Sequence, residues 1–359
     1  MKITIILGTR PEIIKISPII RECQKRHLNF FVLHTNQHYS ENLDRVFFKE
    51  LELPQPKYNL NIGSGMHGEQ TGKMLIGIEK VLIKEKPNIV LVEGDTNTVL
   101  AGALAAAKLH IKVAHIEAGL RSYFREMPEE INRVLADHCS DLLFAPTIKS
   151  KEILLGEGIP KNKVYVVGNT IVDAVYQNLK LAREKSKILE KLNLQKEKYF
   201  VLTTHREENV DKKERFQGIL QGLDLIYKKF NFPIIYPIHP RAKKMIEKFK
   251  LNIPKGVKLI EPLGYLDFLQ LEANSKLILT DSGGVQEESC ILKVPCVTLR
   301  DNTERPETLE VGSNILAGTN PQKILNSASR MANKKRNWKN PFGSGRAGEK
   351  IIKILSNII

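Results

Sequence analysis

The chain has 359 residues, enough for two domains of ordinary size. Hydrophobic residues make up 42% of it and charged residues 26%, which is typical of a folded globular protein and excludes an intrinsically disordered one. The 55 Lys and Arg residues outnumber the 40 Asp and Glu residues, and the net charge of +15 raises the question of an anionic partner.

Short apolar segments alternate with helical patterns from the N-terminus onward, which is typical of a parallel α/β architecture. The first half predicts six strands in one doubly wound sheet. These strands are residues 2–7, 30–34, 88–92, 112–116, 141–145 and 163–167. A long helix rich in Lys, Glu and Leu is predicted next, over about 170–195.

The alternation then restarts in a second half with its own strands. They are residues 199–205, 233–239, 257–262, 276–281 and 294–299. We therefore expect two Rossmann-like, doubly wound α/β domains, residues 1–168 and 169–335, that face a central cleft. A helical tail, residues 336–359, is expected to return toward the N-terminal domain. Open α/β sheets bind ligands beyond the carboxyl ends of their strands, so the residues that follow each strand are the first candidates for a site.

Several common signatures are absent from the sequence. It has no GxGxxG after a strand, no GxxxxGK[ST], no HExxH and no GxSxG, which argues against a dinucleotide dehydrogenase, a P-loop NTPase, a zinc protease and an α/β-hydrolase. Cys23, Cys139, Cys290 and Cys296 have the spacing of neither a metal site nor a disulfide framework. With no signal-peptide pattern and no long apolar run, a cytoplasmic protein is expected.

Charged residues follow the strands of the first half. Arg10 and Lys15 lie near a helix N-terminus after the first strand, where two cations and free backbone N–H groups suit an anion; an ordinary turn with solvated cations is the alternative. Asp95, Glu117 and Glu129 follow later strands or open a helix. Helix capping explains each acid singly, but three acids at neighbouring strand ends favour an acid–base site.

In the second half, the segment TDSGGVQEE is the most specific. Gly283 and Gly284 would let a phosphate approach the N-terminus of a helix, and Glu288 would accept hydrogen bonds from ribose hydroxyls. A loop that needs positive φ would explain the glycines but not Ser282 together with Glu288.

Three other residues of the second half are candidates. His205 ends a strand and is either structural or a catalytic or phosphate-binding group. Arg305 adds a cation after another strand. Phe268 belongs either to the core or to a surface that stacks on a base.

The motifs GTRPE, GDTNTVLAGALAA, HIEAGLRS, MPEEINR, GNTIVDA, THREEN, TDSGGVQEE, RDNTERPE and NPFGSGRA together resemble those of the non-hydrolysing UDP-N-acetylglucosamine 2-epimerases. The resemblance covers essentially the whole chain. It implies the two-domain glycosyltransferase-B-like fold, a homodimer and no metal or redox cofactor. It also implies inversion at C2 of UDP-N-acetylglucosamine to UDP-N-acetylmannosamine, through elimination of UDP, a 2-acetamidoglucal intermediate and re-addition.

The resemblance also implies roles for individual residues. Those that line the sugar and pyrophosphate are Arg10, Lys15, Asp95, Glu117, Glu129 and His205, and those that hold the uridine side are Phe268, Ser282, Gly283, Gly284, Glu288 and Arg305. The predicted catalytic residues are Asp95, Glu117, Glu129 and His205, because protonation on either face of C2 requires groups on both sides. Which carboxylate acts as base and which as acid stays open.

Some members of that family bind a second UDP-N-acetylglucosamine as an activator. Gln37, His38, Gln70 and Arg206 match the context of that site. Glu207 follows Arg206 where relatives often carry a second arginine, and this reversal of charge weakens the prediction of an activator site.

Alternative functions make different predictions. A UDP-sugar glycosyltransferase of the same shape requires an acceptor, and a hydrolysing 2-epimerase releases N-acetylmannosamine and UDP. A nucleic-acid-binding protein is suggested only by the net charge. Residues 321–359 hold nine Lys and Arg residues and one acid, so most of the excess lies outside the candidate site. We expect no nucleic-acid or membrane partner.

Overall fold

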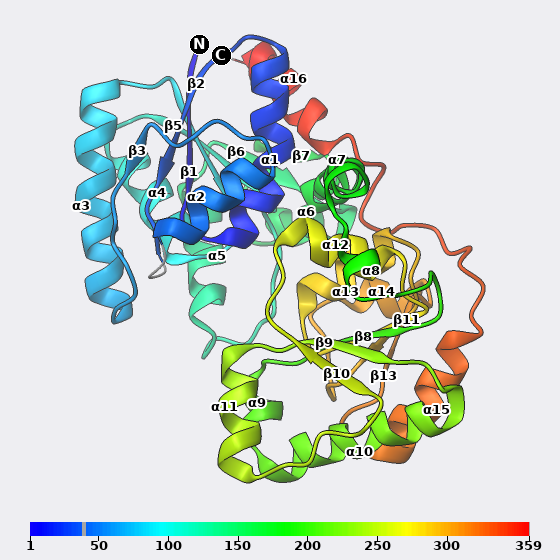
Figure 1. Ribbon diagram of the computed structural model, residues 1–359. Helices are drawn as coiled ribbons and strands as arrows, with labels where there is room; N and C mark the ends of the chain where they lie inside the picture. Colours follow the sequence, from blue (N-terminus) through cyan, green and yellow to red (C-terminus); the bar gives the residue numbers. More distant parts are fainter. Residues whose placement is uncertain (38–40, 359) are drawn as a thin grey trace. The chain divides into compact units, whose positions relative to one another are not determined.

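Figure 1 shows the computed structural model, which describes residues 1–37 and 41–358, without the side chains of residues 41–45. The chain forms two compact units. The first unit comprises residues 1–177 and 342–359, and the second comprises residues 178–341, so the second unit is inserted into the first. Within the described residues, no helix is both long and apolar enough to cross a lipid bilayer.

The described part of the first unit contains a seven-stranded parallel sheet in the order β3-β2-β1-β4-β5-β6-β7. The strands are β1 (Lys2–Leu7), β2 (Asn29–His34), β3 (Tyr58–Asn59), β4 (Ile89–Glu93), β5 (Lys112–Ile116), β6 (Leu142–Ala145) and β7 (Val164–Val166). The prediction of six strands was wrong by one, because β3 is a two-residue edge strand too short to show an apolar period. The strand order reverses between β1 and β4, where doubly wound sheets bind their ligands.

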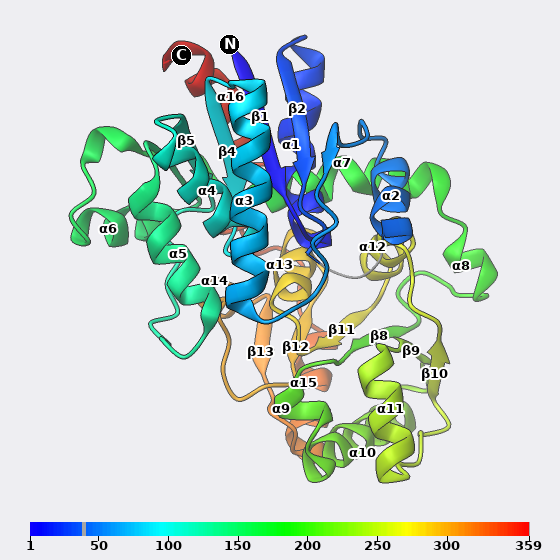
Figure 2. The same cartoon turned by 90° about the vertical axis from the view of Figure 1, so that its left-hand side faces the viewer.

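Helices cover this sheet on both faces (Figure 2). They are α1 (Arg10–Lys25), α2 (Glu41–Glu50), α3 (His67–Glu85), α4 (Asn97–Lys108), α5 (Pro128–Cys139), α6 (Ile148–Gly156), a 3-10 turn at Lys161–Lys163, α7 (Thr170–Lys185) and α16 (Ala347–Ile358). Because both faces of the sheet are covered, all five residues of β4, IVLVE, are buried, and buried and exposed residues do not alternate along the strand.

The C-terminal helix belongs to the first unit. Asp173 of α7 accepts hydrogen bonds from the backbone N–H groups of Ala347 (3.1 Å) and Gly348 (2.9 Å), which satisfies the N-terminus of α16. Ile351 and Leu355 of α16 are fully buried, and α16 packs against α1. The predicted return of the C-terminal helix to the N-terminal half is confirmed.

The described part of the second unit contains a six-stranded parallel sheet in the order β10-β9-β8-β11-β12-β13. The strands are β8 (Phe200–Thr203), β9 (Ile234–Pro237), β10 (Val257–Ile260), β11 (Leu277–Thr280), β12 (Cys296–Thr298) and β13 (Asn314–Leu316). The sequence predicted all but β13, a three-residue edge strand. The order reverses between β8 and β11, so the prediction of two doubly wound α/β domains is confirmed.

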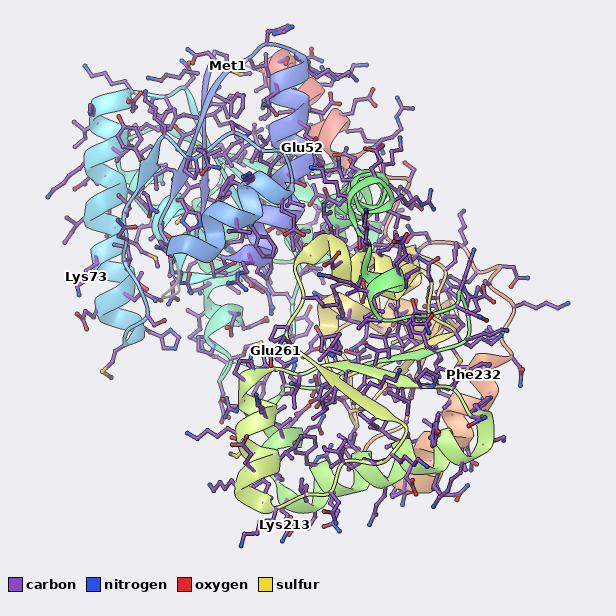
Figure 3. The ribbon with its side chains drawn as sticks, in the orientation of Figure 1. Met1, Glu52, Lys73, Lys213, Phe232 and Glu261 are labelled. Atoms are coloured by element: carbon purple, nitrogen blue, oxygen red, sulfur yellow. The ribbon has the colours of Figure 1, made fainter. Side chains whose placement is uncertain are left out.

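Side chains fill the space between the second sheet and its helices, while Lys213 at the start of α10 lies on the outside (Figure 3). The helices are α8 (Ile188–Lys191), α9 (Glu207–Val210), α10 (Lys213–Phe230), α11 (Pro240–Phe249), α12 (Tyr265–Ala273), α13 (Gly283–Ile291), α14 (Pro306–Glu310) and α15 (Pro321–Ala332). The single helix predicted over about 170–195 is interrupted between α7 and α8, where Ser186 donates a hydrogen bond to Asp267 at 2.6 Å.

Candidate functional site

The turn between β1 and α1 is closed by the chain itself. Glu12 accepts hydrogen bonds from the backbone N–H groups of Gly8 (2.6 Å) and Thr9 (2.8 Å), and from the hydroxyl of Thr96. Burial raises the pKa of Glu12 to about 7, although these three donors oppose the shift. The expectation that these backbone groups are free for an anion was wrong, because a sequence pattern does not show that Glu12 folds back as a capping box.

Lys15 lies between two acids at the carboxyl ends of β4 and β5. Its Nζ is 2.7 Å and 2.6 Å from the two carboxylate oxygens of Glu117 and 3.5 Å from Oε1 of Glu93. Glu117 has a φ of 68°, a left-handed conformation that costs free energy for a residue with a side chain. Burial raises the pKa of Glu93 well above its usual range, and the negative charge of Glu117 adds to the shift while Lys15 opposes it.

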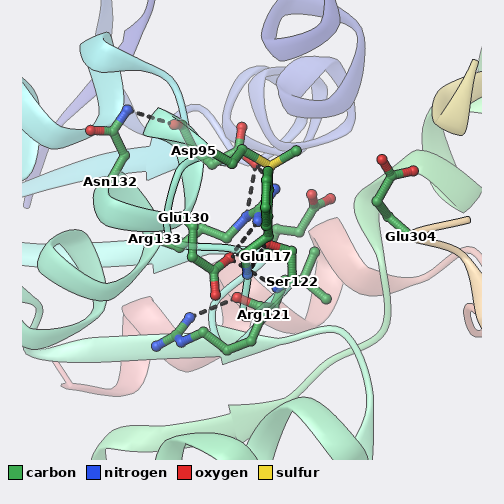
Figure 4. Close-up of polar contacts among 12 residues, drawn as sticks. Asp95, Glu117, Arg121, Ser122, Glu130, Asn132, Arg133 and Glu304 are labelled. Carbon is green, nitrogen blue, oxygen red and sulfur yellow. Dashed lines mark hydrogen bonds and ion pairs between the residues drawn. The ribbon is translucent and has the colours of Figure 1, made fainter. Parts of the chain in front are cut away.

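Asp95 is held from α5 by Arg133 (Figure 4). Nε and Nη2 of Arg133 lie 2.9 Å and 2.5 Å from Asp95 Oδ2, and Nη1 lies 2.7 Å from Oε2 of Glu130. The N-terminus of α4 is capped by Thr96, whose hydroxyl accepts a hydrogen bond from the backbone N–H of Val99. Asp95 is therefore not the helix cap that a lone Asp at this position suggests.

Two consecutive glutamates open α5, and they differ in environment. Glu130 is 6% exposed and accepts hydrogen bonds from the backbone N–H groups of Ser122 and Tyr123, both at 2.9 Å. Burial raises the pKa of Glu130, but these bonds and Arg133 outweigh it and lower the pKa overall. Glu129 is exposed on the first turn of the helix. A catalytic role for Glu129 stays a prediction.

Arg10 lies over an aromatic ring. Its guanidinium carbon is 5.2 Å from the centre of the Phe47 ring, a cation–π arrangement that holds the side chain beside the β1–α1 turn.

Two residues of the predicted activator site are in contact. Gln70 donates hydrogen bonds to the backbone carbonyls of Gln37 (3.2 Å) and Gly63 (2.8 Å) and accepts one from Asn97 at 2.9 Å. Gln37 accepts a hydrogen bond from Thr98 at 3.0 Å. His38 lies outside the described residues.

In the second unit, a buried aspartate organises the turn after β8. Asp281 is fully buried and accepts hydrogen bonds from the backbone N–H groups of His205 and Arg206 and from the side chain of Asn209. His205 Nδ1 lies 3.2 Å from Asp281 Oδ1, and 42% of the His205 side chain is exposed. Burial raises the pKa of Asp281, but His205 and the N–H donors outweigh it, so Asp281 stays charged and orients the ring.

The N-terminus of α13 is open. Ser282 is the N-cap residue, and its side chain makes no capping hydrogen bond. A Cβ added to Gly283 or Gly284 would meet nothing nearer than 3.8 Å and 3.9 Å respectively, and neither glycine has a positive φ. The fold of the described residues therefore does not require glycine at either position, whereas close approach of a ligand to the backbone does.

Glu288 lies one turn further into α13. It is 8% exposed, and its Oε1 accepts a hydrogen bond from the hydroxyl of Tyr265 at 2.9 Å. Phe268 is partly buried and packs against the apolar cluster that contains Val285 and Ile278. The structure thus places Phe268 at the margin of the core.

Two arginines near α14 are engaged by acids. Arg305 Nε lies 2.7 Å from Oε1 of Glu287, and Nη1 of Arg206 lies 3.4 Å from Oε1 of Glu304. Burial raises the pKa of Glu304, but Arg300 and Arg206 outweigh it and lower the pKa to about 2. Glu207, which follows Arg206 in the chain, forms an ion pair with Arg241.

Among the residues that the structure describes, no group of three or more His, Cys, Asp or Glu side chains is arranged to hold a metal ion. Sequence reasoning missed residues that contact the predicted site residues or hold the turns around them. Glu93 ends a strand and directly precedes the motif GDTNTVLAGALAA. This position is the sequence signal that could have identified it. The missed residues are Glu12, Glu93, Glu130, Arg133 and Asp281.

The sequence matches the family model described as UDP-N-acetylglucosamine 2-epimerase over residues 21–356. A UDP-N-acetylglucosamine 2-epimerase of Methanococcus maripaludis is 59% identical, and the match covers 99% of this chain and 98% of that protein. The crystal structure of Methanocaldococcus jannaschii UDP-GlcNAc 2-epimerase in complex with UDP-GlcNAc and UDP is 63% identical, with a TM-score of 0.89 over 99% of this chain and 100% of that chain. The Neisseria meningitidis UDP-GlcNAc 2-epimerase bound to UDP-GlcNAc is 38% identical, with a TM-score of 0.89 over 99% of this chain and 100% of that chain.

Proposed function

The chain belongs to the UDP-N-acetylglucosamine 2-epimerase family, and on that premise we propose that it interconverts UDP-GlcNAc and UDP-ManNAc by inversion at C2. Asp95 and Glu117 follow β4 and β5, next to the reversal of strand order, and Lys15 of α1 reaches Glu117 there; this observation carries the proposal. In this proposal the protein is an isomerase that requires no metal or redox cofactor.

The first unit supplies the groups that act on the sugar. The C2–H bond is only weakly acidic, so cleavage of the C1–O bond leads, and the electron-poor C1–C2 region then loses the C2 proton to a carboxylate. Asp95 and Glu117 provide carboxylates beside the cations Arg133 and Lys15. UDP departs, the neutral 2-acetamidoglucal remains bound, and re-addition of UDP with a proton from the opposite face completes the inversion. Glu129 completes the proposed set of proton-transfer groups.

Cations stabilise the departing diphosphate. Negative charge develops on the leaving oxygen as the C1–O bond breaks, and preorganised cations and N–H donors lower the energy of that state. We assign this role to Arg10, Lys15 and His205. Because Asp281 holds the Nδ1 side of the His205 ring, Nε2 is the nitrogen that would face a phosphate or deliver a proton.

The second unit supplies the groups that hold the uridine and its phosphates. The open N-terminus of α13 at Ser282, Gly283 and Gly284 suits the diphosphate, because its N–H groups and dipole favour negative charge. Glu288 would accept the ribose hydroxyls, with Arg305 as a further cation and Phe268 beside the base.

The product formed in D2O tests the proposal. The purified protein is incubated with UDP-GlcNAc in D2O without an acceptor, and products are identified by chromatography and NMR. We expect UDP-ManNAc with deuterium at C2. Free N-acetylmannosamine with UDP would indicate the hydrolysing reaction instead, and product formation only with an added acceptor would indicate a glycosyltransferase.

Variants at the carboxylates test their assignment. Asp95→Asn and Glu117→Gln are each expected to lower kcat by about 100-fold to 10,000-fold, the usual contribution of a positioned acid or base. Glu349→Gln is the matched control, because Glu349 of α16 forms an exposed pair with Arg346, the residue that precedes this helix. Loss of activity in the control, or wild-type activity in both site variants, would contradict the assignment.

We also propose that the protein is a homodimer. Apolar side chains are exposed on α3 and α5, the two helices that pack on either side of α4. Tyr123, Ile131 and Leu135 line a groove of about 280 Å³ on this surface, and Ile76 and Ile83 of α3 are 57% and 55% exposed. Exposed apolar patches of this kind mark interaction surfaces. Activation by a second UDP-GlcNAc, with Gln37, Gln70 and Arg206, stays a prediction.

A further inference from the structure

His115 of β5 is 1% exposed, and each of its ring nitrogens faces an acceptor. Nδ1 lies 2.6 Å from Oδ1 of Asp137 on α5, and Nε2 lies 2.8 Å from the backbone carbonyl oxygen of Gly94. A carbonyl oxygen and a carboxylate cannot donate a hydrogen bond, whereas a neutral imidazole can donate only one. Both contacts are made together only when both ring nitrogens carry protons, so the geometry makes His115 an imidazolium.

The charges around His115 support this state. Burial lowers the pKa of His115, but Asp137, the Gly94 carbonyl and Glu117 outweigh it and raise the pKa overall. Asp137 also pairs with Arg121 at 2.7 Å, and Arg121 pairs with Glu157 of α6 at 2.6 Å. The positive charges of His115 and Arg121 are balanced by the negative charges of Asp137 and Glu157. The doubly protonated His115 therefore adds no net charge to this cluster.

The contacts of His115 and Asp137 reach both turns that carry the proposed catalytic carboxylates. Gly94 precedes Asp95 and has a φ of 88°. Both of its backbone polar groups are bonded to β5. Its carbonyl accepts a hydrogen bond from the His115 ring, and its N–H donates one to the carbonyl of Ile116 at 3.1 Å. Asp137 accepts a hydrogen bond from the backbone N–H of Gly119 at 3.2 Å, two residues after Glu117.

We propose that His115 is a positioning residue for the epimerisation, and that its doubly protonated ring, clamped between Asp137 and the Gly94 carbonyl, fixes Asp95 and Glu117 relative to each other. This inference rests on the proposed function. Because the ring is buried, it acts through the backbone of the two turns and through its charge rather than by contact with substrate. The strained backbone of Glu117 is the kind of conformation that persists only where the surroundings hold it.

The protonation state is tested directly, without reference to activity. The protein is labelled with 15N-histidine, and the His115 signals are identified by their loss in His115→Gln. We expect both ring nitrogens to keep the shifts of a protonated ring from pH 6 to pH 9. A neutral tautomer at pH 8 would overturn the proposal, even in a protein that proves inactive on UDP-GlcNAc.

Two substitutions then separate the two hydrogen bonds. In His115→Gln the amide nitrogen takes the place of Nε2 and can donate to Gly94, whereas in His115→Asn it takes the place of Nδ1 and can donate to Asp137. We expect kcat to fall at least tenfold in both, and further in His115→Asn, with KM changed less than threefold. Since a cation that interacts electrostatically with Glu117 is lost, the acidic limb of the kcat/KM profile is expected to move to higher pH in both.

His138→Gln is the matched control, because His138 is an exposed residue of α5 that bonds only the carbonyl of Val134 among the described residues. Hydrogen exchange of the segments 93–96 and 117–121 is measured in all variants, and we expect it to be faster in both His115 variants. Unchanged exchange, or a fall in activity with no shift of the pH profile, would contradict the positioning role. An inactive wild-type protein would count against the proposed function, while the histidine spectra and the exchange rates would still decide this inference.

Discussion

At the scale of single residues, one buried cation is shared by two acids. Lys15 forms its short contacts with Glu117 and a longer one with Glu93, whose pKa burial raises. A protonated Glu93 leaves the positive charge of Lys15 to Glu117 alone. The protonation state of Glu93 thus controls how strongly the positive charge of Lys15 acts on the Glu117 carboxylate.

Asp95 and Glu117 follow the ends of β4 and β5, as the sequence predicted, because the end of a parallel strand is visible as the end of an apolar run. Lys15 lies in α1, the helix that the sequence predicted after the first strand. Sequence reasoning could not separate Glu129 from Glu130, since consecutive helical residues point about 100° apart and only packing decides which one is buried. The same limit hid Arg133, which reaches Asp95 from a helix distant in sequence.

Glu272 of α12 yields a prediction of stability against pH. It is fully buried, and none of the described residues hydrogen bonds either of its carboxyl oxygens. Burial and the charge of Glu288 raise its pKa well above 4.5, so Glu272 takes up a proton on folding and the protein loses stability as the pH rises above that value. Glu272→Met should therefore raise the free energy of unfolding by about 2 kcal/mol or more at pH 8 and by less at pH 5.

Urea unfolding of the wild type and the variant at the two pH values measures this difference. Glu261→Met is the control, because the Glu261 side chain is 87% exposed, and no pH-dependent gain is expected from it. A Glu272→Met protein that is less stable than the wild type at pH 8 would show that Glu272 has a favourable partner when charged.

At the scale of elements, two helix N-termini at strand ends have opposite states. In the turn that leads into α1, Glu12 occupies the backbone N–H groups of Gly8 and Thr9, whereas at α13 the N-cap residue Ser282 makes no side-chain cap. The sequence motif GTRPE and the motif TDSGG both predict an anion site, and only the fold shows which of the two still has N–H groups to offer.

The strands that sequence reasoning found lie within longer apolar segments, such as 163–167 around the three-residue β7 and 294–299 around the three-residue β12. β3 and β13, with two and three residues at sheet edges, have no period to detect. The sequence shows the motifs GNTIVDA and NPFGSGRA, but it does not show that they are in contact. Asp173 of the first motif caps α16, which begins at the end of the second, and these residues are far apart in the chain.

Gly283→Ala separates binding from stability. An alanine at this position meets no obstacle and favours the helix, so the free energy of unfolding should rise by about 0.5 kcal/mol. Its methyl group occupies the space where the backbone would meet the diphosphate, so the Kd for UDP should rise about tenfold or more. Calorimetric titration with UDP and thermal unfolding measure the two effects.

Gly119→Ala is the contrasting variant, because Gly119 has a φ of 81° and a Cβ there would lie 2.3 Å from the carbonyl oxygen of Ser150. It should lower stability. Tighter or unchanged UDP binding by Gly283→Ala would exclude this helix N-terminus as the diphosphate site.

At the scale of the whole molecule, the net charge of +15 says little about the chemistry. The candidate residues lie at the carboxyl edges of the two sheets, whereas most of the basic excess lies in residues 321–359. The apolar surface of α3 and α5 is the more informative feature of the exterior.

Ile131→Glu tests that surface. A charge placed in the apolar groove of α5 should convert the proposed dimer into a monomer at micromolar concentration, because burial of an unpaired carboxylate opposes association. Sedimentation velocity measures the change. Ile148→Glu, on α6 and at a residue that is 67% exposed, should leave the mass unchanged. A wild-type protein that sediments as a monomer would contradict the dimer itself.

The insertion of the second unit into the first has a consequence during translation. Residues 178–341 leave the ribosome as one continuous stretch, but the first unit needs residues from both ends of the chain, since Ile351 and Leu355 of α16 fill its core beside α1. The second sheet is thus complete while α1 still lacks its last partner. The half that carries the acids of the proposed chemistry therefore receives its last helix only after the whole of the second unit has been synthesised.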